Sequence, residues 1–506
     1  MTEVHIELQR VQTWLFAVPR LRAMVGANTL LGEALRVRLP ELARGRSSWT
    51  LVRGIGGYPS SSADDPLAGH DDPASDAQDG ILSRDGGHFE ASFASGAKEF
   101  AAAAALLLRR ELPGIRFGIS MDGERLDEPS ADLSTELPVL APCEWTGRGL
   151  ASVPIRQGTE RASVSLDVSR RHAAALRAED GKAQDLASLL MAITSLKSIR
   201  LLGTFDGLAG RGYLALIHAD GNGVGGAAQL ASAEERATFF HRNRVLLRRA
   251  LRSAIDAVCA GAEVAPLQLL MLGGDDLLVV SRADMALPFV AKLCEELAGL
   301  QRDDGVGFKL TLGVGVVFAR PTIPIHRLHD VAERLAASAK RRFRGFSAAE
   351  RRSVVDWAVY TTSWVDDPEE VRRRDWVRGA GDAARVLSRR PVDAAGSGLD
   401  SLQGLLDAAE KIKGAPRSQL RYLVEQLPRG RALAELAFAE LSKQARKALG
   451  DAGVTEVWTG TGDGPLLTSL LDLVEISEIR RLGQAGTVIG EPILEEDGEE
   501  EELVET

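Results

Sequence analysis

The stretches YLALIHADGNGVGG, at residues 213–226, and PLQLLMLGGDDLLVVS, at residues 266–281, decide the fold of this chain. The first is an apolar strand that breaks into a glycine-rich turn. The second is an apolar run, a Gly-Gly turn and another apolar run, which is typical of a hairpin. Apolar spacing predicts helices at 233–260, 285–300 and 324–342, and a strand at 308–319. This β-α-β-β-α-β order predicts a ferredoxin-like domain.

The first part of the chain repeats the same order. Alternating residues 4–8 predict a strand and residues 11–39 a helix; ILSRDGGHFEASF at 81–93 predicts a hairpin, followed by a helix and a strand near 115–120. A loop rich in Gly, Pro, Ser and Asp, at residues 54–79, is expected to be exposed and mobile. The chain is therefore predicted to be α+β, with two ferredoxin-like palm domains related by internal duplication.

The expected organisation has five parts. It comprises a first, non-catalytic palm at 1–130, a connector at 131–205, a second palm at 206–390, a helical domain at 391–490 and an acidic disordered tail at 491–506. Only the second hairpin keeps paired carboxylates, because the first has Gly-Gly-His-Phe where the second has Gly-Gly-Asp-Asp. We therefore expect the chemistry in the second palm.

Three carboxylates converge in that predicted palm. Asp220 ends the first strand, and Asp275 and Asp276 lie at the hairpin turn. Nucleotidyl transfer uses two divalent cations about 4 Å apart, and Mg²⁺ prefers carboxylate oxygens. The pattern predicts a site for two Mg²⁺ or Mn²⁺ ions on Asp220, Asp275 and Asp276, with a nucleoside triphosphate as substrate.

Glycines surround these carboxylates and predict room for phosphate groups. Gly273 and Gly274 let a triphosphate approach the backbone, and the glycines after Asp220 offer backbone N–H groups at the start of the next helix. They are Gly221, Gly223, Gly225 and Gly226. Lys340, near the end of the last palm helix, is a candidate triphosphate ligand, although a solvated lysine is also favoured at a helix C-terminus.

Other polar motifs have simpler interpretations. The His329-Asp330 and His70-Asp71 pairs could suggest a phosphohydrolase, but such a site needs further His and Asp ligands, and the chain has 8 scattered histidines. His218 shares the strand face of Asp220 and is expected to be a packing residue. An arginine cluster with interleaved phenylalanines, at residues 341–352, is expected either to contact RNA or a partner, or to be a solvated face.

The overall composition excludes several classes of protein. A net charge of −10 and a pI near 5.5 argue against general electrostatic binding of nucleic acid. The three cysteines have no paired spacing, which excludes a disulfide framework. There is no signal-peptide pattern and no apolar run of about 18 residues, so we expect a cytoplasmic protein that is not inserted in a membrane.

The sequence resembles the large palm-containing subunit of type III CRISPR effector complexes (Csm/Cmr type). The resemblance lies in the quoted strands, in the segment at residues 311–340 and in the opening segment at residues 5–35. The resemblance implies synthesis of cyclic oligoadenylates from ATP, in partnership with other effector subunits, crRNA and target RNA. It also implies that Asp220, Asp275 and Asp276 bind metal. The sequence departs from the family pattern in two places. It shows no HD nuclease pattern, so cleavage of single-stranded DNA is not expected, and Cys143 stands alone where a zinc ribbon would need paired cysteines.

Two alternatives remain open at the level of sequence. The palm could bind nucleotide without turnover, as a structural subunit of a crRNA-guided complex. The second alternative is a diguanylate-cyclase-like enzyme. Such enzymes have a single palm per chain and a Gly-Gly-Asp-Glu-Phe or similar turn, whereas Leu277 follows the acidic pair here. Base preference, product size and the activating signal are not determined by the sequence.

Overall fold

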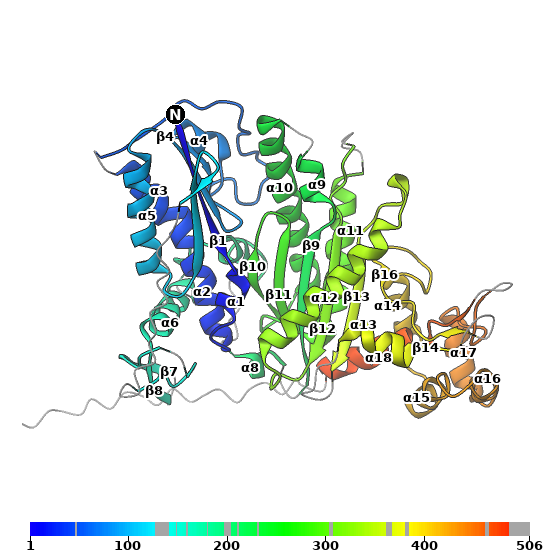
Figure 1. Ribbon diagram of the computed structural model, residues 1–506. Helices are drawn as coiled ribbons and strands as arrows, with labels where there is room; N and C mark the ends of the chain where they lie inside the picture. The colour runs from blue at the N-terminus through cyan, green and yellow to red at the C-terminus, as the bar shows by residue number, and fades with distance from the viewer. Residues whose placement is uncertain are drawn as a thin grey trace, which may run out of the picture.

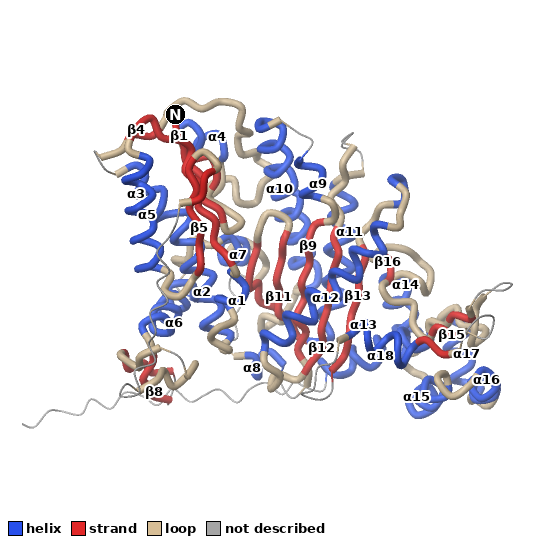
Figure 2. Tube along the Cα trace, in the orientation of Figure 1, coloured by secondary structure: helices blue, strands red, loops and turns tan. Residues whose placement is uncertain are grey.

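The computed structural model describes residues 1–45, 48–126, 141–147, 149–157, 160–179, 181–196, 204–209, 212–229, 232–302, 307–360, 367–379, 384–460 and 465–484. Two six-stranded sheets stand beside each other, each with helices on its faces (Figures 1 and 2). The acidic tail lies outside the described residues. Within the described ranges, no helix combines the length and hydrophobicity needed to cross a bilayer.

The first sheet is built from residues near the N-terminus. Its strands follow the order β2-β4-β1-β5-β6, with β3 paired to β4. In chain order its elements are β1 (Thr2–Gln9), α1 (Val11–Leu15), α2 (Leu21–Glu33), α3 (Leu39–Arg44), β2 (Thr50–Leu51), α4 (Pro73–Gln78), β3 (Ile81–Ser83), β4 (His88–Ser95), α5 (Ala97–Glu111), β5 (Arg116–Met121) and β6 (Glu124–Arg125). The alternation of Val4, Ile6 and Leu8 places these three side chains in the core.

The second sheet has the strand order β10-β11-β9-β12-β13-β16. Its elements are β9 (Leu214–Gly221), α9 (Val224–Gln229), α10 (Ala233–Val258), β10 (Leu267–Leu272), β11 (Asp276–Arg282), α11 (Ala283–Leu300), β12 (Leu312–Ala319), α12 (Ile325–Arg344), β13 (Val354–Tyr360) and β16 (Val392–Asp393). In both sheets the first strand lies between the third and fourth strands of the β-α-β-β-α-β unit. This order is ferredoxin-like, so the predicted pair of palm domains is confirmed.

The helix α12 lies directly on β12 because two strand positions have no side chain. A Cβ added to Gly315 would lie 2.0 Å from the carbonyl oxygen of Ala332, and one added to Gly313 would lie 2.6 Å from Cγ of Lys340. Both distances are shorter than real contacts, so only glycine permits this approach. The close packing fixes α12 over the strand that neighbours β9.

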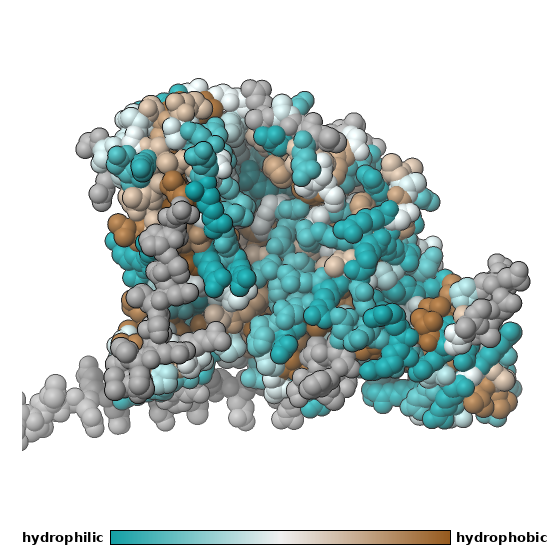
Figure 3. Space-filling model, in the orientation of Figure 1, coloured by the Kyte–Doolittle hydropathy of each residue, from teal (hydrophilic) through white to brown (hydrophobic). Residues whose placement is uncertain are grey.

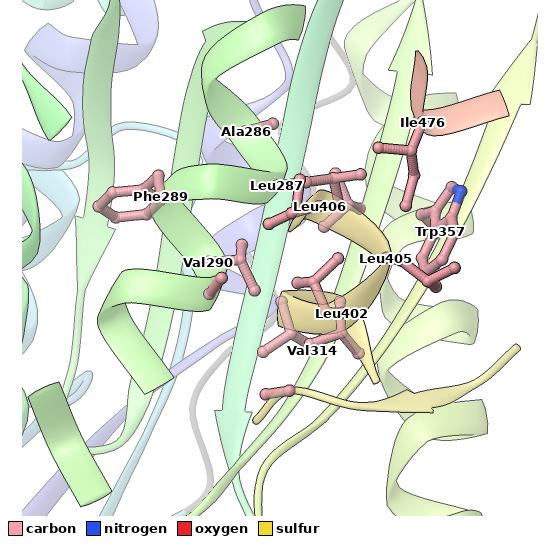
Figure 4. Close-up of a cluster of buried hydrophobic side chains, with 14 of the residues drawn as sticks. Ala286, Leu287, Phe289, Val290, Val314, Trp357, Leu402, Leu405, Leu406 and Ile476 are labelled. Carbon is pink, nitrogen blue, oxygen red and sulfur yellow. The ribbon is translucent and has the colours of Figure 1, made fainter. Parts of the chain in front are cut away.

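The remaining elements lie beside the first palm or beside the second palm (Figure 1). They are β7 (Val153–Gln157), β8 (Glu160–Val164), α6 (Leu166–Glu179), α7 (Leu186–Met191), α8 (Phe205–Ala209), α13 (Pro368–Val371), β14 (Val377–Arg378), β15 (Arg385–Val386), α14 (Leu402–Lys411), α15 (Arg417–Gln426), α16 (Arg431–Ala439), α17 (Lys443–Asp451), β17 (Leu466–Leu467) and α18 (Leu470–Gln484). Figure 4 shows apolar side chains of α11 packed against α14 and Ile476 of α18, so the C-terminal helices share the core of the second palm.

The expectation of an exposed loop at residues 54–79 is wrong for the part of the segment that packs against the second palm. The segment contains α4, and its Asp65, Leu67 and Asp71 are almost fully buried. Arg248 of α10 binds both aspartates, at 2.9 Å to Asp65 and 2.6 Å to Asp71. The polar composition of the segment predicted that it would be exposed to solvent. The two aspartates can be buried because an arginine of the other palm compensates their charge, and composition alone does not predict such a long-range pair.

Cys143 is buried beside Val18, Ala23, Val164 and Val168, close to the β7–β8 hairpin. The three cysteines are free, and Cys259 and Cys294 belong to the core of the second palm.

Candidate metal and nucleotide site

Two of the three candidate carboxylates face each other across adjacent strands. Asp220, at the end of β9, is paired in register with Asp276, at the start of β11. Opposite residues of an antiparallel pair point to the same face, with Cβ atoms about 5 Å apart. Asp275 precedes Asp276 in the turn, and its carbonyl oxygen accepts a hydrogen bond of 3.1 Å from the Gly221 amide. The structure therefore brings Asp220, Asp275 and Asp276 together at one edge of the sheet.

Burial and mutual repulsion disfavour negative charge on this cluster. Burial and the neighbouring Asp220 raise the pKa of Asp275 to about 6. Burial, Asp220 and Asp275 raise the pKa of Asp276 to about 7. In addition, Oδ1 of Asp276 is buried without a hydrogen-bond partner. Buried carboxylates that repel one another are suited to binding divalent cations, because a cation would neutralise their negative charge.

Lys340 supplies one positive charge at the cluster. Its ammonium group forms an ion pair with Oδ2 of Asp220. The lysine side chain passes over Gly313, the residue paired with Asp220 on β12. The sequence-predicted lysine is therefore beside the carboxylates, and its role as a triphosphate ligand stays a prediction.

The candidate glycines fall into two groups. Gly221, Gly273 and Gly274 adjoin the carboxylates: a Cβ on Gly221 would lie 2.6 Å from Oδ2 of Asp275, and the Gly273 amide donates a 2.7 Å hydrogen bond to the Asp276 carbonyl. Gly223 has a positive φ of 72°, and Gly225 lies in the first turn of α9. No neighbour lies within 4 Å of a Cβ added to either of these two residues, so the surface beside the cluster is open.

His218 was expected to be a packing residue, and it is buried. It also connects the carboxylates to α12. Its Nδ1 lies 3.8 Å from Oδ1 of Asp276, and its ring is perpendicular to that of His329 at 5.6 Å between centroids. Glu333, one helical turn after His329, contributes to the raised pKa of Asp276. Sequence reasoning missed Glu333, although the four-residue spacing from His329 to Glu333 could have signalled a shared helix face.

The first palm reaches this site through its own hairpin turn. Asp85, in the turn between β3 and β4, binds Arg36 at 2.5 Å and Arg244 of α10 at 3.2 Å. Arg244 also adjoins the Gly-Gly-Asp-Asp turn of the second palm, since a Cβ added to Gly274 would lie 3.9 Å from Cγ of Arg244. The space-filling view is hydrophilic and hollowed between β1 and α10 (Figure 3). The Gly-Gly turns of the two palms therefore approach the same arginine-bearing helix.

The arginine cluster at residues 341–352 is partly engaged within the chain. Arg341 pairs with Glu369, and Arg342 and Arg352 both pair with Asp393. Arg351 lies over the ring of Phe343, at 5.7 Å from its centroid. These contacts connect α12 to the segments that follow it, and a role in RNA binding stays a prediction.

The fold and the clustered carboxylates define a palm domain of the polymerase and nucleotide-cyclase class. Residues 213–345 match the family model described as Cas10/Cmr2, second palm domain. The second palm therefore belongs to that family of domains.

Solved structures of low sequence identity are also similar to this chain. Csm1 from T. onnurineus matches with 14% identity and a TM-score of 0.44, over 95% of this chain and 69% of that one. A Csm1–Csm4 cassette in complex with cA4 matches with 13% identity and a TM-score of 0.44, over 95% and 69%. A cassette with pppApApA matches with 14% identity and a TM-score of 0.43, over 94% and 69%. No curated protein sequence matches the chain.

Proposed function

We propose that this protein is a nucleotidyltransferase that joins ATP into cyclic oligoadenylates in CRISPR-type antiviral defence. The observation that carries the proposal is the pairing of Asp220 with Asp276, with Asp275 beside them, in a palm of the Cas10/Cmr2 family. A polymerase or cyclase palm needs carboxylates held by rigid neighbouring strands, because small displacements of reacting groups are costly in rate.

The proposed reaction forms one bond and breaks another. The 3′-hydroxyl of one nucleotide gives up its proton to water, and its oxygen attacks the α-phosphorus of a second nucleotide. A phosphodiester bond forms, and pyrophosphate leaves with the electron pair of the broken P–O bond. Two Mg²⁺ or Mn²⁺ ions, held by Asp220, Asp275 and Asp276, would supply the charge that activates the hydroxyl and stabilises pyrophosphate.

Other residues of the chain would bind and orient the triphosphate. Lys340 already lies beside Asp220, and it could exchange that carboxylate for a phosphate oxygen. The open surface at Gly223 and Gly225 leaves room for phosphates next to backbone N–H groups. We also propose, from the family of the second palm, that the chain works with other effector subunits, crRNA and target RNA.

The test is to incubate the purified chain with each labelled nucleoside triphosphate and with Mg²⁺ or Mn²⁺, in the presence and absence of RNA. Products are resolved by mass spectrometry. The Asp275→Ala/Asp276→Ala variant removes two carboxylates, and Glu295→Ala, at an exposed carboxylate of α11, is the matched control.

Oligonucleotide products from the wild type and the control, but not from the double variant, would support the proposal and identify the base. An absence of product under every condition, including with partner subunits and target RNA, would contradict it. That result would favour a structural subunit that binds nucleotide without turnover.

A further inference from the structure

A second group of potential metal ligands lies on α12, away from the carboxylates of the palm turn. It consists of His329, Asp330 and Glu333, whose ligand atoms all lie within 4.8 Å of one another. Among the residues that the structure describes, no other group of His, Cys, Asp and Glu meets this criterion. The helix itself produces the arrangement, because residues three and four positions apart lie on one face.

His329 is buried in a way that leaves its ring without hydrogen bonds. The residue is 4% exposed, its Nε2 has no partner, and its Nδ1 lies 3.8 Å from Oε2 of Glu333, which is too far for a hydrogen bond. The ring is held by Phe16, at 4.8 Å between centroids, and by His218. Nδ1 is the ring atom that faces Glu333, so it is the nitrogen available to a metal ion, while Nε2 is buried in the core.

The two carboxylates of the group also lack compensation. Asp330 and Glu333 are exposed at the same end of the ring, and no lysine or arginine of the described residues forms an ion pair with either. Burial, Asp330 and Asp220 raise the pKa of Glu333. Burial and His218 lower the pKa of His329 to about 3, so its imidazole is neutral and available as a ligand at neutral pH.

We propose that His329, Asp330 and Glu333 bind one divalent transition-metal ion, with Zn²⁺ or Mn²⁺ as the expected class. One imidazole nitrogen and two carboxylate oxygens suit these ions, and remaining positions would be taken by water. Mg²⁺ prefers an all-oxygen set and should bind here weakly. The site is distinct from the all-carboxylate cluster of Asp220, Asp275 and Asp276.

His218 separates the two sites, since it contacts both Asp276 and His329. A cation on Glu333 would neutralise a charge that now acts on Asp276. Occupancy of the α12 site would therefore change the electrostatic field at the palm carboxylates, whether or not those carboxylates perform catalysis.

The experiment measures metal binding directly, with no dependence on activity. Equilibrium dialysis against Zn²⁺, Mn²⁺ or Mg²⁺ is performed on the full chain carrying Asp275→Asn/Asp276→Asn, which weakens the first site. His329→Ala and Glu333→Gln are then added separately. His326→Ala, an exposed histidine in the first turn of the same helix, is the matched control.

We expect the Asp275→Asn/Asp276→Asn chain to bind about one Zn²⁺ per molecule, and each α12 ligand substitution to weaken this binding by about tenfold or more. His326→Ala should leave it unchanged. Absence of Zn²⁺ and Mn²⁺ binding in the parent variant would overturn the proposal. Unchanged affinity in Glu333→Gln, whose exposed side chain can be replaced without disturbing the core, would overturn it as well.

Discussion

Replacing Asp276 by asparagine should stabilise the metal-free protein at alkaline pH. The pKa of Asp276 is raised to about 7 by burial and by its acidic neighbours. A carboxyl group whose pKa is higher in the folded protein binds its proton more tightly there than in the unfolded chain. Protonation therefore favours folding, and this stabilisation is lost as pH rises from the unfolded pKa through the folded one.

The size of the effect follows from the shift. One pKa unit corresponds to about 1.4 kcal/mol, so ionisation of Asp276 would cost at most about 4 kcal/mol. Its side chain keeps 32% of its surface exposed, and solvent screens part of the charge. The expected gain in the free energy of unfolding is then about 2 kcal/mol. It corresponds to a rise in Tm of roughly 4–8 °C for a domain of about 150–250 residues.

Thermal unfolding followed by calorimetry, in chelator-treated buffer between about pH 5 and pH 8, measures this difference. The gap between Asp276→Asn and the wild type should widen as pH rises, and Glu295→Gln, an exposed carboxylate on α11, should show no such gap. Added Mn²⁺ should raise the Tm of the wild type more than that of Asp276→Asn. A variant that is less stable than the wild type at pH 8 without metal would refute the electrostatic reasoning.

Three further changes test other parts of the structure. Arg248→Ala leaves two buried aspartates unpaired between the palms, so chemical denaturation should show a loss of about 3–5 kcal/mol, and an undiminished midpoint would contradict that pairing. Gly315→Ala places a methyl group against the Ala332 carbonyl, and circular dichroism should show a lower Tm and loss of the cooperative transition. Lys340→Met should weaken binding of a non-hydrolysable ATP analogue with Mn²⁺ by about tenfold in calorimetry, whereas Arg344→Met on the same helix should not; equal affinities would remove Lys340 from the nucleotide site.

Much of the second palm could be read from local patterns. Strongly apolar strands interrupted by glycines predicted β9 and the β10–β11 hairpin, because a strand buried on both faces has few polar positions. The position of Asp220 at a strand end and of Asp275 and Asp276 at a turn then implied their proximity, since antiparallel neighbours bring such ends together. The predicted convergence of the three carboxylates is seen in the structure, while their binding of metal remains to be measured.

Contacts between segments distant in the sequence could not be read in this way. The polar segment around Asp65 and Asp71 carries the composition of a mobile loop, and only the docking of Arg248 from the other palm shows why it is buried. Sequence position alone likewise gave no reason to connect Glu333 with Asp276, because the link depends on how closely α12 lies on the sheet.

The sequence by itself determined the order of strands and helices, the duplication of the palm and the three carboxylates, since each strand, helix and turn is predicted from residues next to one another in the chain. Only the tertiary structure decided that Lys340 pairs with Asp220, that His218 lies between Asp276 and His329, and that the two palms share buried charges. Those arrangements arise from packing across long sequence separations, where shape and compensation of charge select one partner among many that the sequence would allow.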